Sequence, residues 1–147
     1  MLNIIVKKLA QRKKESQRGA TAVEFAIVIL VFLTIVFGII EFGLLLYNQH
    51  IVTNAGREGA RYGIVYRTDA NKKTETEIEA WTASWGEQYI VTFGEKAWSV
   101  QATSNNNLDE VCTSSDEELT VEVKYNYDFL FLPFQREITT TTTMKCE

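Results

Sequence analysis

The feature that most constrains this chain is a long apolar stretch near its N-terminus. Residues 18–47 read RGATAVEFAIVILVFLTIVFGIIEFGLLLY, and between Phe25 and Leu46 the only ionisable residue is Glu41. At about 1.5 Å per helical residue, this segment is long enough to cross a hydrocarbon layer of roughly 30 Å. The sequence therefore predicts a membrane helix followed by a region that folds outside the lipid.

Charge is distributed unevenly around this helix. Residues 1–19 contain six basic residues and one acidic residue, whereas the rest of the chain contains nine basic and eighteen acidic ones. Basic residues that flank a membrane helix stay in the cytoplasm, so we expect the N-terminus inside and the acidic region outside. An acidic exterior also argues against nucleic acid as a partner.

The N-terminal edge of the apolar stretch carries a second pattern. A basic segment ends at Gly19, the small residues Ala20-Thr21-Ala22-Val23 follow, and Glu24 opens the apolar run. This order resembles the processing site of type IV pilin-like precursors, in which a membrane peptidase cuts after the glycine and leaves glutamate as the fifth residue. The resemblance implies a cut between Gly19 and Ala20 that removes residues 1–19 as a basic leader peptide.

A physical argument, independent of this resemblance, also explains a glutamate at position 24. A carboxylate at the edge of hydrocarbon costs several kcal/mol unless it finds a partner, and cleavage creates a new amine on Ala20, four residues away. Residues four apart are neighbours on a helix, so Glu24 pairs with its own amine or with that of the next subunit in a filament. The alternative is that Glu24 is an interfacial residue of an uncut signal anchor.

The helical pattern continues beyond the lipid. We expect one helix over residues 20–66 that spans the membrane to about residue 47, with a break near Gly56 as the alternative. Glu41 is expected at the outer interface or against a helix partner. Small residues that would let another helix or a sheet approach closely are Ala55, Gly56, Gly59, Ala60 and Gly63.

Three segments indicate a family. GATAVEF at the start of the helix, IIEFG within it and NAGREGARYG after it are similar to the TadE-like proteins, minor pilin-like subunits of tight-adherence (Tad) pili. The resemblance implies a TadE-like membrane helix and an exported domain larger than the short major pilin of that system. Major pilins typically have tyrosine after the glutamate, so Phe25 favours a minor subunit.

The function that the resemblance implies is structural. The chain would be a minor pilin or pseudopilin of the bacterial inner membrane, processed by a prepilin peptidase and incorporated into an extracellular type IV pilus for cell adhesion. Its partners would be other pilin-like subunits, the assembly platform and the membrane. The alternative is a single-pass, signal-anchored binding or sensor module outside the cytoplasm, which needs neither the glycine cut site nor a glutamate at that depth.

The exported region, residues 67–147, has an α+β pattern. Thr74 and Glu77 fit a capping box ahead of a short helix from Glu75 to about Trp85, which Gly86 would stop. The strongest strand is 119–129, where apolar and polar residues alternate, so that one face is buried and the other is wet. The other candidate strands are 89–93, 97–103 and about 136–145. We expect an antiparallel sheet of three or four strands against the outer half of the long helix.

The two cysteines flank the last two strands. Cys112 precedes strand 119–129 and Cys146 follows the final strand, so a hairpin of these strands would bring the cysteines together. An exported domain meets oxidising conditions, and a disulfide here would add about 2–4 kcal/mol. Two free buried thiols are the alternative.

Catalysis and metal binding find little support in the sequence. His50 is the only histidine, and no nucleophile–base pair is readable beside it, so we expect an interfacial residue and no enzyme. Phosphate-loop and dinucleotide patterns are absent, and no cofactor is expected. Glu75, Glu77 and Glu79 lack the spacing of a calcium loop and are interpreted as a solvated helix face. Two cysteines and one distant histidine do not suit zinc.

An apolar connection separates the last two strands. Residues 129–134 read FLFLPF, although loops usually run over the surface and gain nothing from exposing such groups. Either they complete the core against Trp81, Trp85 or Trp98, or they contact another pilus subunit or the membrane surface. The candidate interface residues are Phe129, Phe131, Leu132 and Phe134.

Overall fold

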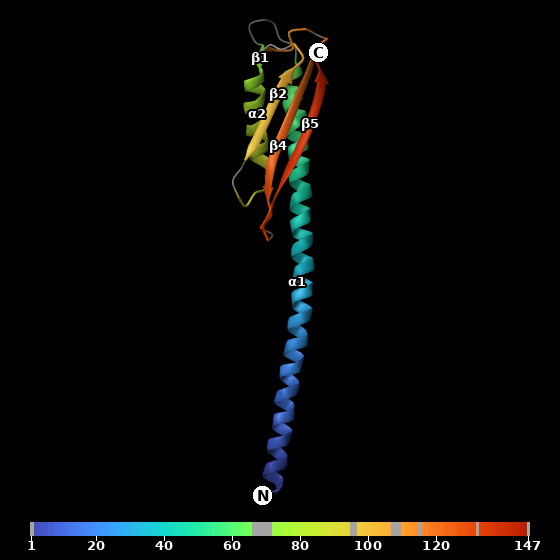
Figure 1. The fold of residues 1–147 in the computed structure, drawn as a ribbon, viewed down its shortest axis with the longest axis vertical. Helices are drawn as coiled ribbons and strands as arrows, with labels where there is room; N and C mark the ends of the chain where they lie inside the picture. The colour runs from blue at the N-terminus through green and yellow to red at the C-terminus, as the bar shows by residue number, and fades with distance from the viewer. Residues whose placement is uncertain are drawn as a thin grey trace. The chain divides into compact units, whose positions relative to one another are not determined.

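The computed structural model describes residues 2–65, 72–94, 97–106, 110–114, 116–131 and 133–146, with the backbone alone for residues 2–18. The chain divides into two compact units, Met1–Ile40 and Glu41–Glu147, which are described separately. The fold class is α+β, as predicted, with a long helix and two small antiparallel sheets (Figure 1). The elements are α1 (Leu2–Ile64), β1 (Lys73–Thr74), α2 (Glu75–Tyr89), β2 (Trp98–Ser104), β3 (Glu110–Val111), β4 (Glu118–Asp128) and β5 (Gln135–Lys145).

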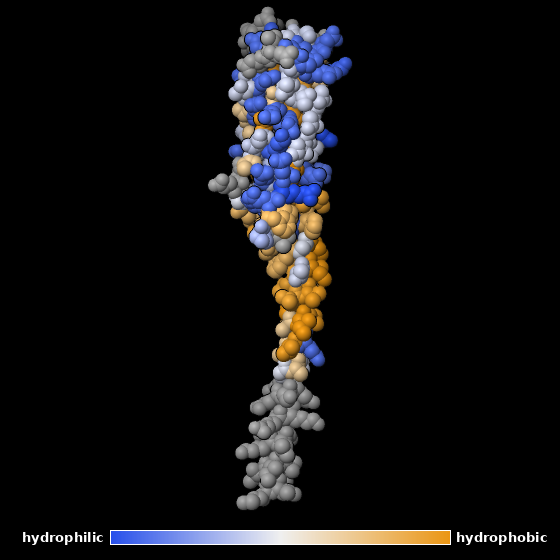
Figure 2. Space-filling model, viewed as in Figure 1, coloured by the Kyte–Doolittle hydropathy of each residue, from blue (hydrophilic) through white to orange (hydrophobic). Residues whose placement is uncertain are grey.

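Helix α1 is continuous, without a break at Gly56. It begins at Leu2, well before the predicted start, because residues 2–18 are rich in good helix formers and contain no proline. It ends at Ile64, and the predicted end at residue 66 lies outside the described residues. The part from Gly19 to Ile64 is long and apolar enough to cross a membrane. Where this helix is coloured within the first unit, hydrophobic residues predominate on its visible face (Figure 2).

The second unit contains the main sheet, in the order β2-β4-β5. All three strands are antiparallel, with Tyr125 of β4 paired to Trp98 of β2 and to Ile138 of β5. The predicted hairpin of the last two strands is confirmed. A two-stranded sheet of β1 and β3 was not predicted. Figure 1 shows α2 and the part of α1 in the second unit, residues 41–64, on the same face of the main sheet. This part is called the outer half of α1 below.

Strand β4 supplies more buried core residues than any other element. Its inward-facing side chains are fully buried, whereas its outward-facing residues are half-buried or exposed, which confirms the predicted alternation. Two of the five buried residues of β4 are tyrosines, so aromatic rings form a large part of this core. The ring centroids of Trp98 on β2 and Tyr125 lie 5.2 Å apart. The buried residues of β4 are Leu119, Val121, Val123, Tyr125 and Tyr127.

Small residues let α1 lie close to this core. A Cβ added at Gly56 would come within 3.2 Å of Thr140 on β5, and one at Gly59 would collide with Thr82 of α2. At Gly63 it would collide with Leu119 of β4. Ala60 is completely buried among them. These positions therefore pack the outer half of α1 against α2 and the sheet.

The region after α2 differs from the prediction. Helix α2 continues through Gly86 to Tyr89, and residues 90–94 form no strand, so the predicted stop at Gly86 and the strand at 89–93 are wrong. Gly86 is needed for space, because a Cβ there would meet the ring of Trp98 at 2.4 Å. The Thr74–Glu77 capping box at the start of α2 is present as predicted.

The predicted disulfide joins Cys112 to Cys146, whose Cα atoms lie 5.4 Å apart. Cys112 has a φ of 59°, a left-handed conformation that is uncommon for residues other than glycine. Beside it, the carboxylate of Glu117 accepts hydrogen bonds from the backbone N–H and the hydroxyl of Thr113. Burial alone would raise the pKa of Glu117, but the hydrogen bonds from Thr113 and Ser114 outweigh it and lower this pKa below its usual value.

The packing of α1 predicts that Gly63 tolerates no side chain. Gly63→Leu should lower the free energy of unfolding of the second unit by about 1–3 kcal/mol, because the side chain overlaps Leu119 and Ile78. The matched control is Gly43→Leu on the same helix, where a Cβ meets no atom within 4 Å. Chemical unfolding in detergent, followed by the fluorescence of the tryptophans, measures both. Equal stability of the two variants would contradict the close approach.

Candidate functional site

The predicted processing and assembly residues lie on one stretch of α1. Gly19, Ala20, Glu24 and Phe25 are all exposed, and a Cβ at Gly19 would meet no atom within 4 Å. Ala20 and Glu24 are four positions apart on a regular helix, which places them on the same side of it. Within the first unit, these residues are therefore accessible to an enzyme or to a neighbouring chain.

Glu41 begins the second unit and is its most unusual residue. Its side chain is 3% exposed, although it lies in the apolar stretch of α1. Oε1 accepts hydrogen bonds from the hydroxyl of Tyr127 (3.1 Å) and the N–H of Leu130 (2.8 Å). Oε2 accepts one from the N–H of Phe131 (3.1 Å). The expected partner was the outer interface or another helix, and the observed partner is the β4–β5 turn of the same chain.

The β4–β5 turn, residues 129–134, needs such an acceptor. A backbone bond from the N–H of Phe129 to the carbonyl of Phe134 closes the turn. The next two N–H groups, of Leu130 and Phe131, both point to the carboxylate of Glu41. Successive backbone N–H groups in a turn form a concave site for an anion. Glu41 therefore holds the turn against α1.

Tyr127 completes the environment of Glu41. Its ring is fully buried on β4 and its hydroxyl donates to the carboxylate. Burial first, and then the hydrogen bond and the negative charge of Glu41, together raise the pKa of Tyr127 to about 12. The phenol thus stays protonated at any physiological pH and remains a hydrogen-bond donor.

The aromatic rings of the turn divide between core and surface. Phe129 packs against Tyr127 at 5.1 Å and against Phe134 at 4.5 Å between ring centroids. Phe131 and Phe134 remain 48% and 52% exposed, and Leu130 41%. Leu132 lies outside the described residues.

The three tryptophan rings pair with tyrosines of α1, α2 and β4. The pairs are Trp81 with Tyr62, Trp85 with Tyr89 and Trp98 with Tyr125. The turn thus has a core side at Phe129 and an apolar outer side.

A second polar contact ties α1 to the segment after α2. Asn48 is completely buried, and its amide binds the backbone of Val91 twice, donating to the carbonyl (2.6 Å) and accepting from the N–H (3.1 Å). The neighbouring Tyr47 donates to the carbonyl of Tyr89. A side-chain amide thus satisfies the backbone groups that a strand partner would otherwise satisfy.

The acids of α2 are not the solvated face that the sequence predicted. Glu75 accepts from the N–H of Ser104 (2.8 Å) and Glu79 from the N–H of Ala102 (3.0 Å), both on β2. Strand β2 is an edge of the main sheet, so these carboxylates cover N–H groups that would otherwise be open to another strand. Glu77 is used in the capping box.

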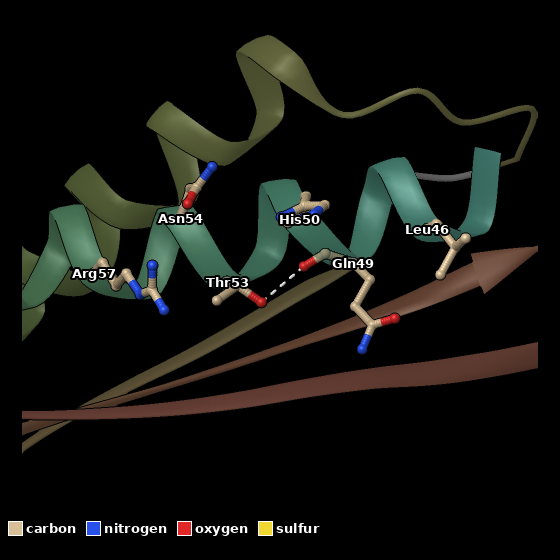
Figure 3. A pocket seen from close by; sticks show the side chains of 6 residues that line it. All are labelled: Leu46, Gln49, His50, Thr53, Asn54 and Arg57. Atoms are coloured by element: carbon tan, nitrogen blue, oxygen red, sulfur yellow. Dashed lines mark hydrogen bonds between the residues drawn. The ribbon is translucent and has the colours of Figure 1, made fainter. Parts of the chain in front are cut away.

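A shallow pocket surrounds His50 on the outer half of α1 (Figure 3). All of its lining residues come from this one helix, and the only hydrogen bond drawn there joins the Thr53 hydroxyl to the backbone carbonyl of Gln49 at 2.8 Å. The lining contains no carboxylate and no cysteine, so it offers no nucleophile–base pair. In the described part of the chain, no three metal-ligating side chains lie together. The lining residues are Leu46, Gln49, His50, Thr53, Asn54 and Arg57.

Comparison with known proteins gives a family match over part of the chain. The model of the family described as TadE-like protein matches residues 19–61, which confirms the resemblance predicted from the sequence over this segment. No curated protein matches the chain. No solved structure matches it either.

The contact between Glu41 and the turn generates a prediction. Glu41→Ala should lower the free energy of unfolding of the second unit by about 2–4 kcal/mol, because two backbone N–H groups and a phenol lose their acceptor. Tyr127→Phe removes one of the three bonds and should cost about 1 kcal/mol. Unfolding in detergent, followed by tryptophan fluorescence, measures the loss.

The matched control is Glu58→Ala, on the same helix. Glu58 lies 3.9 Å from Arg61, with its side chain 41% exposed, so its removal should change stability by less than about 1 kcal/mol. If Glu41→Ala were no more destabilising than Glu58→Ala, the anchoring of the turn by Glu41 would be wrong.

Proposed function

We propose that this chain, which is TadE-like over residues 19–61, is a structural or assembly subunit of a Tad-type type IV pilus. In this proposal it is a minor pilin or pseudopilin, held in the bacterial inner membrane by α1, with the second unit outside the cytoplasm. The observation that carries the proposal is the family match, which covers the predicted cut site, Glu24 and most of the outer half of α1 in one segment. The TadE-like family is associated with Tad pili and has a structural rather than a catalytic role.

The character of the two units supports this proposal. The described helix in the first unit carries exposed apolar side chains, among them Phe25, Leu30 and Ile39, as a helix in lipid requires. The second unit carries a disulfide, which persists in oxidising compartments outside the cytoplasm. The basic residues of the leader favour a cytoplasmic N-terminus.

Processing is the step that distinguishes this function from a simple anchor. A prepilin peptidase would cut between Gly19 and Ala20, removing residues 1–19 and leaving Glu24 as the fifth residue of the mature chain. The new amine of Ala20 and the carboxylate of Glu24 would then lie on one side of the helix, available to each other or to neighbouring pilin-like subunits. Assembly through the N-terminal helix would thereby depend on cleavage.

The first prediction from this function concerns the leader. In cells with an active prepilin peptidase, the membrane-bound chain should begin at Ala20, whereas a Gly19→Leu variant should keep residues 1–19. Intact-mass spectrometry of protein purified from membranes gives the answer directly. Gly38→Leu is the matched control, because Gly38 also has no atom near its Cβ position and lies outside the cut site. An uncut wild-type chain would favour the signal-anchored binding or sensor module.

The second prediction concerns Glu24. Glu24→Ala should still insert and be cleaved, but should weaken co-purification with other pilin-like subunits and reduce piliation, because the neighbour's amine loses its carboxylate partner. Thr34→Ala serves as the control, since the Thr34 hydroxyl bonds to the carbonyl of Leu30 within its own helix. Piliation of the Glu24 variant at the wild-type level would argue decisively against a role in assembly.

A further inference from the structure

The outer side of the β4–β5 turn is an apolar surface within a mostly hydrophilic unit. Leu130, Phe131 and Phe134 are 41%, 48% and 52% exposed, respectively. In Figure 2, hydrophobic residues gather at the end of this unit that contains the turn, whereas hydrophilic residues cover most of its remaining visible face. Exposed apolar groups of this kind mark a surface that contacts a partner or a membrane.

Glu41 determines the position of this surface along the axis of α1. Its carboxylate binds the N–H groups of Leu130 and Phe131, so the turn lies beside that part of the helix. The apolar run of α1 continues from Glu41 to Leu46, about 7.5 Å further along the helix axis. Phe42 and Leu46 are 65% and 59% exposed. The turn therefore lies beside helix positions whose side chains are apolar and exposed, and not beside the polar part of the helix that follows.

The polar groups next to this surface suit a phospholipid. Arg136, at the start of β5, is exposed and shares a groove with apolar side chains of α1, including Phe42, Leu45 and Leu46. Glu137 and Gln49 also line this groove. An arginine beside apolar side chains can bind a phosphate while its stem stays in contact with them. Gln135 donates to the carboxylate of Asp128 (2.6 Å) at the polar margin of the turn.

We propose that the β4–β5 turn inserts into the outer leaflet of the membrane that α1 crosses. Phe131 and Phe134 contact the acyl chains, and Arg136 lies at the level of the lipid phosphates. The occupant is lipid rather than a second protein, because the same lipid that surrounds Phe42 and Leu46 reaches the turn. The inference rests on the proposed function only in requiring that α1 spans the membrane.

The test measures the lipid contact of single positions in the full-length chain, reconstituted in phosphatidylcholine and phosphatidylglycerol vesicles. Phe131→Cys and Phe134→Cys are labelled with the environment-sensitive fluorophore NBD, and doxyl-labelled phospholipid is added as a quencher. Both positions should show blue-shifted NBD emission that the quenching lipid reduces. Formation of the Cys112–Cys146 disulfide and unchanged tryptophan fluorescence show that the labelled chains are folded.

Two control positions make the outcomes distinguishable. Thr143→Cys, exposed near the far end of β5, should keep water-like emission and resist quenching. Ile35→Cys, in the apolar run, should be strongly quenched. Quenching at Ile35 without quenching at Phe131 and Phe134 would overturn the inference and leave the proposed function intact.

Two further outcomes would also overturn the inference. If Ile35 were not quenched, α1 would not span the membrane, and both the proposed function and this inference would fall. If NBD at Phe131 and Phe134 were blue-shifted but insensitive to the quenching lipid, and the shift vanished when the protein was diluted in excess lipid, a second copy of the chain would cover the turn. That result would also overturn insertion into lipid.

Discussion

The second unit depends on the burial of one stripe of α1. Along this stripe, small residues allow the backbone to lie close to β4, β5 and α2, so that the aromatic and branched side chains of β4 are buried beneath it. Burying each large apolar side chain contributes about 1.5–3 kcal/mol, which the close approach makes available. Two polar residues interrupt the stripe, Glu41 and Asn48, and both bind backbone groups of distant segments. The stripe therefore defines where the turn after β4 and the segment after α2 are held.

Local patterns in the sequence were sufficient for most of the elements. The alternation of 119–129 predicts β4 and its buried face, and pairing of the two following strands places Cys112 beside Cys146 without any further information. The Thr74–Glu77 pattern predicts the start of α2 because capping is a contact over three residues. The continuity of α1 follows from the absence of proline. In each case the determining interaction is short-range or follows from strand order.

The contacts that the sequence did not reveal join side chains to distant backbone. Asn48 binds Val91, and Glu75 and Glu79 bind the edge of β2, but the backbone partner has no residue-type signature in any of these cases. Gly86 was misread for a related reason. A glycine that ends a helix and a glycine that makes room for a ring look the same in sequence, and only the position of Trp98 distinguishes them. For Glu41 a signal existed, namely a lone acid in an apolar run, but it could not name the partner.

The two acids of the apolar stretch illustrate how far such a signal reaches. Glu24 and Glu41 both face the same cost, since a carboxylate in or beside hydrocarbon requires a partner. Glu41 obtains three hydrogen bonds from its own chain and is buried, so it needs nothing from a neighbour. Glu24 is exposed, so in the proposed function its compensation would come from the Ala20 amine that cleavage creates or from another molecule. The physical requirement is thus the same for both, while the source of the partner separates a residue that holds the fold together from one available for assembly.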